Sequence, residues 1–184
     1  FSRKVLDRAM TIEMNDVDLY GGLSEKYEKI GKLGLTELVG SAVEGVDVYE
    51  TYQSECDIVL QYLQSVNEAL NNTPFKIAYR TRNEFLLYVV NNLPYAKDAD
   101  GNDIAQNVVI ARALDEITSM KILSRIEGDD TKVSKNLLDT LSATIKEELQ
   151  TIVGAETSFE SKVSLPKLKE MKTRLECGYT SFWS

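Results

Sequence analysis

Residues 80–92 read RTRNEFLLYVVNN, and the apolar run at the centre of this stretch decides the fold. Six consecutive apolar residues, from Phe85 to Val90, follow a polar start and precede two asparagines. A helix that is apolar around most of its circumference has to be surrounded by other elements. We therefore expect this stretch to be the central, most buried helix of a helical bundle.

One further helix is predicted on each side of this stretch. Residues 52–70 place apolar side chains three or four positions apart, which puts them on one helical face, and the sequence Asn-Asn-Thr-Pro at 71–74 ends that helix. Asp103 is placed to cap the helix on the other side, because a carboxylate can accept hydrogen bonds from the free N–H groups of a first turn. Gly128 is placed to stop this helix near Ile126.

Two more helices follow toward the C-terminus. Apolar residues recur at helical spacing over 133–149, with Gly154 beyond the last of them, and again over 165–175. Gly178 is a plausible C-cap for the last helix. The rings of Tyr179, Phe182 and Trp183 come next, and burial of such rings would lock this tail onto the bundle.

The N-terminal quarter of the chain has a different character. Residues 11–14 alternate like a short strand, and six of the ten glycines then fall between Gly21 and Gly45. Because glycine loses the most backbone entropy in a regular element, such a density predicts an irregular segment. The sequence thus divides into 1–20 with a short β segment, an irregular excursion over 21–50, and a helical domain over 51–184. The fold class is mainly α.

Composition limits the classes of function. The chain carries 21 Lys and Arg against 29 Asp and Glu, a net charge of −8, which opposes non-specific DNA binding. The apolar runs are far shorter than the roughly 20 residues that cross a bilayer, so we expect no membrane span. Cys56 and Cys177 lie far apart and there is no histidine to complete a zinc site, which predicts no metal and two reduced thiols in a cytoplasmic protein.

Several catalytic motifs are missing from the sequence. Gly31-Lys32 is followed by Leu33, so the chain has no GxxxxGK[ST] loop to hold nucleotide phosphates. Serine and cysteine have no evident base beside them, which leaves triad chemistry without its parts. The acidic stretch 98–102 imitates a calcium loop, but its register places alanine and asparagine where carboxylates are needed, and a turn explains it better.

Three stretches together resemble one known family. These are Phe1–Met14, FSRKVLDRAMTIEM; the span from Phe75 to Gly128, with its Tyr-Arg step and the KILSRIEG sequence; and Ser164–Trp183, SLPKLKEMKTRLECGYTSFW. In this order they resemble the C-terminal part of McrB-type AAA+ NTPases, the motor subunits of 5-methylcytosine-specific restriction systems. The resemblance implies that the chain is a fragment, with the end of an AAA+ core over residues 1–20 followed by a helical lid.

The same resemblance implies an activity and partners for the parent protein. That protein would bind GTP or ATP with Mg²⁺, assemble as a homo-oligomeric ring, and drive a McrC-type nuclease subunit on DNA held by another domain. The fragment alone should be inactive and bind no cofactor, because it has no P-loop.

Arg8 is the candidate catalytic residue. It lies in Val-Leu-Asp-Arg-Ala at 5–9, which resembles the segment where AAA+ proteins place an arginine that reaches the neighbouring subunit's nucleotide. A guanidinium group can neutralise charge on a transferring γ-phosphoryl group. The other interpretation is a surface arginine paired with Asp7 or Glu13. Arg3 is the rival within the same segment.

Arg80, Arg82 and Glu84 are the candidate nucleotide-sensing residues. They lie at the start of the predicted central helix, in the place where AAA+ lids carry the sensor-2 arginine. Cations are disfavoured at a helix N-terminus, so two arginines there suggest an external anion such as a phosphate. Glu84 could orient Arg80 from one turn away. The competing interpretation pairs one or both arginines with Glu84 or with a carboxylate elsewhere.

A different class of function remains open. The acidic charge, the aromatic tail and the absence of a P-loop also fit a freestanding helical protein-interaction domain with no NTPase activity. A P-loop in the same polypeptide would distinguish the two, because only the motor interpretation requires one.

Overall fold

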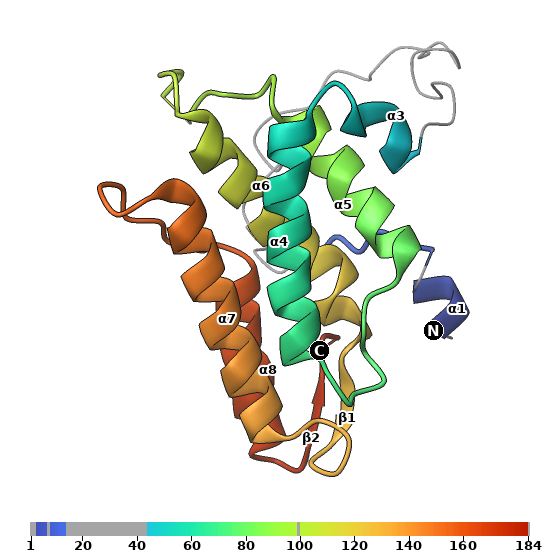
Figure 1. Cartoon of the computed structure of the whole chain (residues 1–184). Coiled ribbons are helices and arrows are strands. Elements are labelled where there is room, and N and C mark those ends of the chain that lie inside the picture. Colours follow the sequence, from blue (N-terminus) through green and yellow to red (C-terminus); the bar gives the residue numbers. More distant parts are fainter. Residues whose placement is uncertain (1–2, 7, 14–43, 99, 184) are drawn as a thin grey trace, which may run out of the picture. The chain divides into compact units, whose positions relative to one another are not determined.

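The computed structural model describes residues 3–6, 8–13, 44–98 and 100–183. Phe1–Thr11 and Glu44–Ser184 form one compact unit, and Ile12–Val43 forms a second. The first unit is a mainly α-helical bundle, as the sequence predicts, and its described residues also form a short two-stranded sheet (Figure 1). No helix in these described ranges has both the length and the apolar character needed to cross a membrane.

The described part of the bundle contains five longer helices and several short elements, arranged as in Figure 1. All four flanking helices of the sequence prediction are present, although some of their ends differ. The described elements are α1 (Arg3–Leu6), α3 (Gly45–Tyr49), α4 (Gln53–Ala69), α5 (Tyr79–Asn92), α6 (Gln106–Lys121), the 3₁₀ turn η1 (Leu123–Arg125), β1 (Glu127–Asp129), α7 (Lys135–Val153), α8 (Ser164–Leu175) and β2 (Tyr179–Ser181).

The central helix is α6, and the prediction that residues 80–92 would be the most buried was wrong. Ten of the sixteen residues of α6 are buried, against five of fourteen in α5. Helix α6 packs against three of the longer helices, α5, α7 and α8, whereas α5 packs against α4, α6 and the short helix α3. In α5, Phe85 and Val89 are fully buried, while Leu87 and Tyr88 are only partly covered.

Buried polar side chains on α6 explain why its central place is hidden in the sequence. Thr118 is fully buried, and its Oγ1 lies 2.7 Å from the hydroxyl oxygen of Tyr62 on α4. Burial raises the pKa of Tyr62 well above its ordinary value. A polar group can enter a core when it finds such a partner. Hydropathy patterns count these positions as exposed, so the stripe on α6 looks narrower than it is.

Asp115 of α6 organises the beginning of α8. Its carboxylate is 2 % exposed and accepts hydrogen bonds from the backbone N–H groups of Lys162, Val163 and Ser164 at 2.9–3.0 Å. It also accepts one from the hydroxyl group of Ser161 at 2.6 Å and one from that of Ser164. The free N–H groups of Val163 and Ser164 are therefore satisfied by a side chain from another helix, while that of Leu165 donates to the Ser161 hydroxyl group at 3.0 Å.

Two predicted helix signals act differently in the structure. Asp103 does not cap α6, whose N-cap is Ala105; instead the Asp103 carboxylate is exposed and pairs with Lys97 at 2.6 Å. Gly128 does not stop the helix near Ile126, because α6 ends at Lys121 and a 3₁₀ turn follows. The predicted end of α7 is confirmed, with Gly154, at φ 86°, beyond the last turn; its N-cap is Ser134, for which no prediction was made.

The β structure lies elsewhere than expected. Residues 11–13 have no regular secondary structure, and Met14 falls outside the described residues. The pairing occurs instead between β1 and β2, which are antiparallel with Gly128 opposite Thr180. Helix α3 lies within the predicted irregular excursion over 21–50; the rest of that excursion as far as residue 43 is outside the described residues.

Candidate functional site

A shallow groove runs along α3, α4 and the beginning of α5. It consists of two adjoining cavities of about 280 and 390 Å³ that share Leu60 and Arg82 as lining residues. The walls are mostly apolar, and among the described lining residues the guanidinium group of Arg82 is the only charged group. The other lining residues are Gly45, Val46, Tyr49 and Leu86 in the first cavity and Leu63, Asn67, Ile77, Ala78 and Tyr79 in the second.

The position of Arg82 is set by two neighbours on its own helix. Its Nε and Nη2 atoms donate to Oδ1 of Asn83 at 3.1 and 2.8 Å, and its guanidinium carbon lies 5.0 Å from the centre of the Tyr79 ring. Stacking on an aromatic face is favourable for a guanidinium group. Neither neighbour is acidic, so neither compensates the positive charge of Arg82.

Gly45 allows helix α3 to approach this part of α5. A Cβ atom on Gly45 would lie 2.9 Å from Oδ1 of Asn83 and 3.1 Å from Cδ1 of Leu86. Because the Asn83 oxygen is the acceptor for Arg82, the missing side chain at Gly45 protects the contact that orients the arginine. Sequence reasoning found Arg82 but missed Asn83 and Gly45, since only the packing of α3 on α5 connects them.

Arg80 is exposed in the first turn of α5, which contains no acidic residue. Among the described residues, no carboxylate forms an ion pair with Arg80 or with Arg82. The N-terminal end of a helix already carries a partial positive charge from its free N–H groups. This end of α5 is therefore locally cationic in a chain whose net charge is −8.

Glu84 forms no ion pair with Arg80 or Arg82. Its Oε2 atom lies 2.7 Å from Nζ of Lys121, and the lysine side chain is only 1 % exposed. The contact is an ion pair at close distance, but it lacks the angle of a hydrogen bond. The prediction that Glu84 orients or neutralises Arg80 was therefore wrong, because the carboxylate compensates a buried ammonium group instead.

Arg8 is exposed and lies two residues after the end of the short helix α1. Its backbone N–H donates to the carbonyl oxygen of Val5 at 3.0 Å. Among the described residues, Arg8 has no carboxylate partner; Asp7, one of the partners considered for it, lies outside them. Arg3 is part of α1, and its side chain is also outside the described part of the chain.

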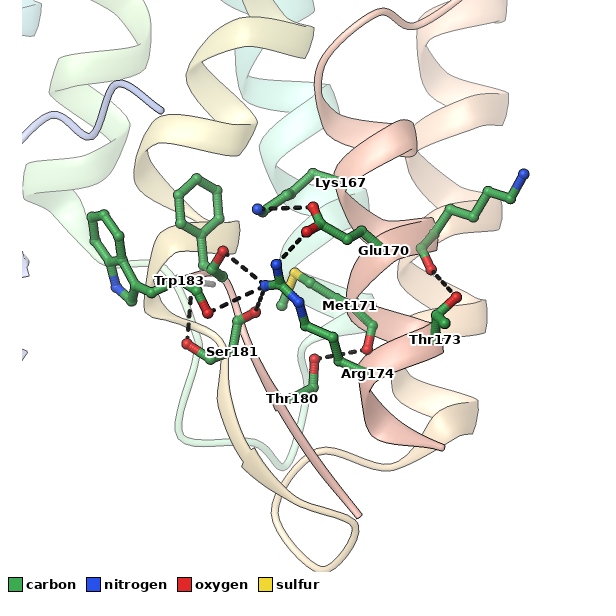
Figure 2. Close-up of polar contacts among 10 residues, drawn as sticks. Lys167, Glu170, Met171, Thr173, Arg174, Thr180, Ser181 and Trp183 are labelled. Atoms are coloured by element: carbon green, nitrogen blue, oxygen red, sulfur yellow. Dashed lines mark hydrogen bonds and ion pairs between the residues drawn. The ribbon is translucent and has the colours of Figure 1, made fainter. Parts of the chain in front are cut away.

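The C-terminal tail is held by a cluster of polar contacts with α8, shown in Figure 2. Nη1 of Arg174 donates to the carbonyl oxygens of the last three described residues, Ser181 at 2.8 Å and Phe182 and Trp183 at 3.2 Å. Nη2 of Arg174 pairs with Glu170, whose other carboxylate oxygen lies 3.0 Å from Nζ of Lys167.

The rings of the tail divide into one that is buried and two that are not. Phe182 is 1 % exposed and lies under Nζ of Lys167, which is 4.6 Å from the ring centre. Tyr179 and Trp183 are 54 % and 37 % exposed. The prediction that the tail is locked onto the bundle is confirmed, but the ring of Phe182 alone supplies the deep burial among the three.

The acidic loop at 98–102 is a turn, as predicted. Oδ1 of Asp98 accepts hydrogen bonds from the backbone N–H groups of Asp100 and Asn102, and Oδ2 accepts one from the Asn102 side chain. These bonds, above all the one from the Asn102 side chain, lower the pKa of Asp98. Gly101 adopts the positive φ of 84° that this tight loop requires.

Fold and site together describe a mainly α bundle with an arginine-bearing groove at the start of α5. Residues 38–178 match the family described as Domain of unknown function (DUF8727), and the chain therefore belongs to this family. The matched range contains all described lining residues of the groove and also Arg80, whereas Arg8 lies outside it. No curated protein and no solved structure matches the chain.

Proposed function

We propose that this chain is the lid, with the preceding arginine-bearing segment, of an AAA+ nucleoside triphosphatase of the McrB type. One observation carries the proposal most directly. Arg80 and Arg82 occupy the first turns of α5 with no carboxylate among the described residues to neutralise them, because Glu84 is paired with Lys121. Two cations at the positive end of a helix form a suitable place for the phosphate groups of a nucleotide.

In this proposal the two arginine positions have separate tasks. Arg80, with Arg82 beside it, contacts the phosphates of the nucleotide bound by the same subunit and couples their presence to movement of the bundle. Arg8 reaches the nucleotide of the adjacent subunit and neutralises charge on the transferring γ-phosphoryl group. The P-loop and the Mg²⁺ ligands come from an AAA+ core, which supplies the GTP- or ATP-binding chemistry that this chain lacks.

The assembly that follows from this role is a ring of identical subunits. Hydrolysis takes place between neighbours, because the P-loop of one subunit has to meet Arg8 of the next. A McrC-type nuclease is the proposed partner of the ring, and another domain of the complete polypeptide binds DNA. The net charge of −8 agrees with DNA contact outside this chain.

The test measures nucleotide affinity and turnover in the complete protein. We expect Arg8→Ala to leave nucleotide affinity nearly intact and to reduce turnover by about 10³-fold or more, as loss of an arginine finger does. Arg80→Ala should weaken nucleotide affinity by about 10- to 100-fold, the effect of losing one charge-assisted hydrogen bond. Unchanged turnover in the Arg8 variant would overturn the assignment.

Lys146→Ala is the matched control for these variants. Lys146 is exposed on α7, so its replacement removes one positive charge away from the groove. Affinity and turnover should both remain at the wild-type level in this variant. A similar loss in Lys146→Ala would mean that net charge, not the position of the arginines, produces the effect.

The apolar walls of the groove favour one second candidate, a helical protein-interaction domain. Val46 and Tyr79 are 67 % and 78 % exposed at its edges. The matching occupant is a short apolar peptide segment with one carboxylate for Arg82, since that guanidinium is the charged group of the lining. Absence of any nucleotide turnover in the complete wild-type protein would favour this candidate over the NTPase.

A further inference from the structure

Lys121, the last residue of α6, is a buried cation with contacts in two directions. Its side chain is 1 % exposed. The Nζ atom donates a hydrogen bond to the carbonyl oxygen of Ala9 at 2.8 Å and lies 2.7 Å from Oε2 of Glu84. The contact with Ala9 joins residues 112 positions apart in sequence, and the contact with Glu84 joins α6 to α5.

The two segments that meet at Lys121 are those that carry the candidate arginines. Ala9 follows Arg8 directly, so its carbonyl group belongs to the turn that presents the Arg8 side chain. Glu84 lies one helical turn after Arg80 on α5. A single ammonium group therefore contacts both the Arg8 segment and the helix of Arg80 and Arg82.

The burial of Lys121 makes this connection sensitive to its partners. An ammonium group removed from water needs a compensating charge and hydrogen-bond acceptors. Glu84 supplies the charge and Ala9 supplies an acceptor. Because both contacts involve the same nitrogen atom, a displacement of Glu84 changes the position from which Lys121 holds Ala9.

We propose that Lys121 and Glu84 are positioning residues that couple the arginine-bearing end of α5 to the Arg8 segment. When α5 moves with the nucleotide phosphates, Glu84 carries Lys121 with it, and Lys121 shifts the Ala9 carbonyl and hence Arg8. The state of one subunit's own nucleotide thereby sets the reach of Arg8 toward its neighbour. The contact itself is independent of the proposed function, whereas its effect on turnover rests on it.

The contact is tested by hydrogen exchange in the isolated chain. Glu84→Gln keeps the shape of the side chain and removes its charge, and we expect faster exchange of the backbone amides at 9–11, with the core of α4 unchanged. Glu170→Gln is the matched control, because Glu170 also pairs with a nearly buried lysine, Lys167. It should affect the tail at 180–183 and leave 9–11 unchanged. Unaltered exchange at 9–11 in Glu84→Gln would overturn the proposal.

The coupling is tested by turnover in the complete protein. Glu84→Gln should lower kcat by about 5- to 150-fold, the usual range of a coupling between sites, with KM unchanged. In the Arg8→Ala background the same substitution should leave the residual turnover unaltered, because its effect passes through Arg8. A merely structural role would lower turnover equally in both backgrounds and would overturn the coupling.

Two further variants make the outcome specific. Glu84→Asp keeps the charge and shortens the reach, so it should produce a smaller change in kcat than Glu84→Gln. Lys121→Arg keeps the cation and should retain more turnover than Lys121→Met; equal loss in both would contradict a role for the charge. If Arg8→Ala itself leaves turnover unchanged, the proposed function fails, while the exchange experiment still decides the contact.

Discussion

Gly45 shows how one missing side chain can set the geometry of a binding group. The residue is buried where α3 meets α5, and a Cβ atom there would lie 2.9 Å from Oδ1 of Asn83. That oxygen accepts two hydrogen bonds from Arg82. The orientation of the arginine thus depends on a glycine in another helix, which has no chemistry of its own.

Gly45→Ala should therefore disturb the groove more than its size suggests. The new methyl group has to displace Asn83 or Leu86, and overpacking of this kind costs about 1–3 kcal/mol of unfolding free energy. Urea unfolding followed by circular dichroism measures the loss. Val46→Ala, at an exposed position of the same helix, is the control and should change stability by less than about 0.5 kcal/mol. Equal stability of the two variants would contradict the close approach.

Helix α8 is held at its beginning by a residue of another helix, whereas α7 is capped locally. Ser134 accepts a hydrogen bond from the N–H group of Leu137 at 3.1 Å, the usual arrangement for an N-cap. For α8, the acceptor is Asp115, which lies 46 to 49 positions before the groups that donate to it. The two helices that lie side by side in Figure 1 thus begin in physically different ways.

This difference predicts two unequal losses of stability. Ser134→Ala should cost about 1 kcal/mol, as the loss of a local N-cap does. Asp115→Ala should cost about 3 kcal/mol or more, because several buried donors lose their acceptor together. Chemical denaturation of both variants gives the comparison. A smaller loss for Asp115→Ala than for Ser134→Ala would show that the carboxylate does not hold α8 in place.

The contrast also shows what the sequence can predict about elements. The apolar face of helix α7 and the glycine beyond its end were predicted closely, because both are local signals, whereas its N-cap Ser134 was not predicted. The central position of α6 was not predicted, because Thr118, Asp115 and Lys121 are buried by partners from distant parts of the chain. The place of Arg80 and Arg82 at the start of a helix was predicted, and their role at the site stays a prediction. The partner of Glu84 could not be predicted, because Lys121 lies 37 positions away in sequence.

Acidic groups dominate the electrostatics of the whole molecule. Hydrogen bonds lower the pKa of several of them: the Lys172 side chain acts on Asp139, the Thr131 hydroxyl on Asp129, and the Ser54 hydroxyl on Glu55. In each case the folded state holds the carboxylate form more strongly than the unfolded chain does. These groups therefore favour folding above the ordinary carboxyl pKa of about 4.

Stability should consequently fall as the pH drops from about 5 to 3, because the unfolded chain, whose carboxyl groups have the higher pKa, binds protons more readily than the folded state does. Each exposed group contributes little, since solvent screens it, and the effect is a sum over the surface. Urea midpoints at a series of pH values measure it. Asp139→Asn should make the decline shallower by removing the pair with Lys172. A midpoint that rises over this pH range would contradict the sign.

The C-terminal tail, which polar contacts hold against α8, carries a natural fluorescent reporter. Trp183 is the single tryptophan of the chain, and its indole ring meets the buried Phe182 edge to face at 5.3 Å between ring centres. Its emission therefore reports departure of the tail, while far-ultraviolet ellipticity reports the helices. Coincident transitions of the two signals would mean that tail and bundle melt as one cooperative unit, and an earlier change in emission would mean that the tail detaches from a bundle that is still folded.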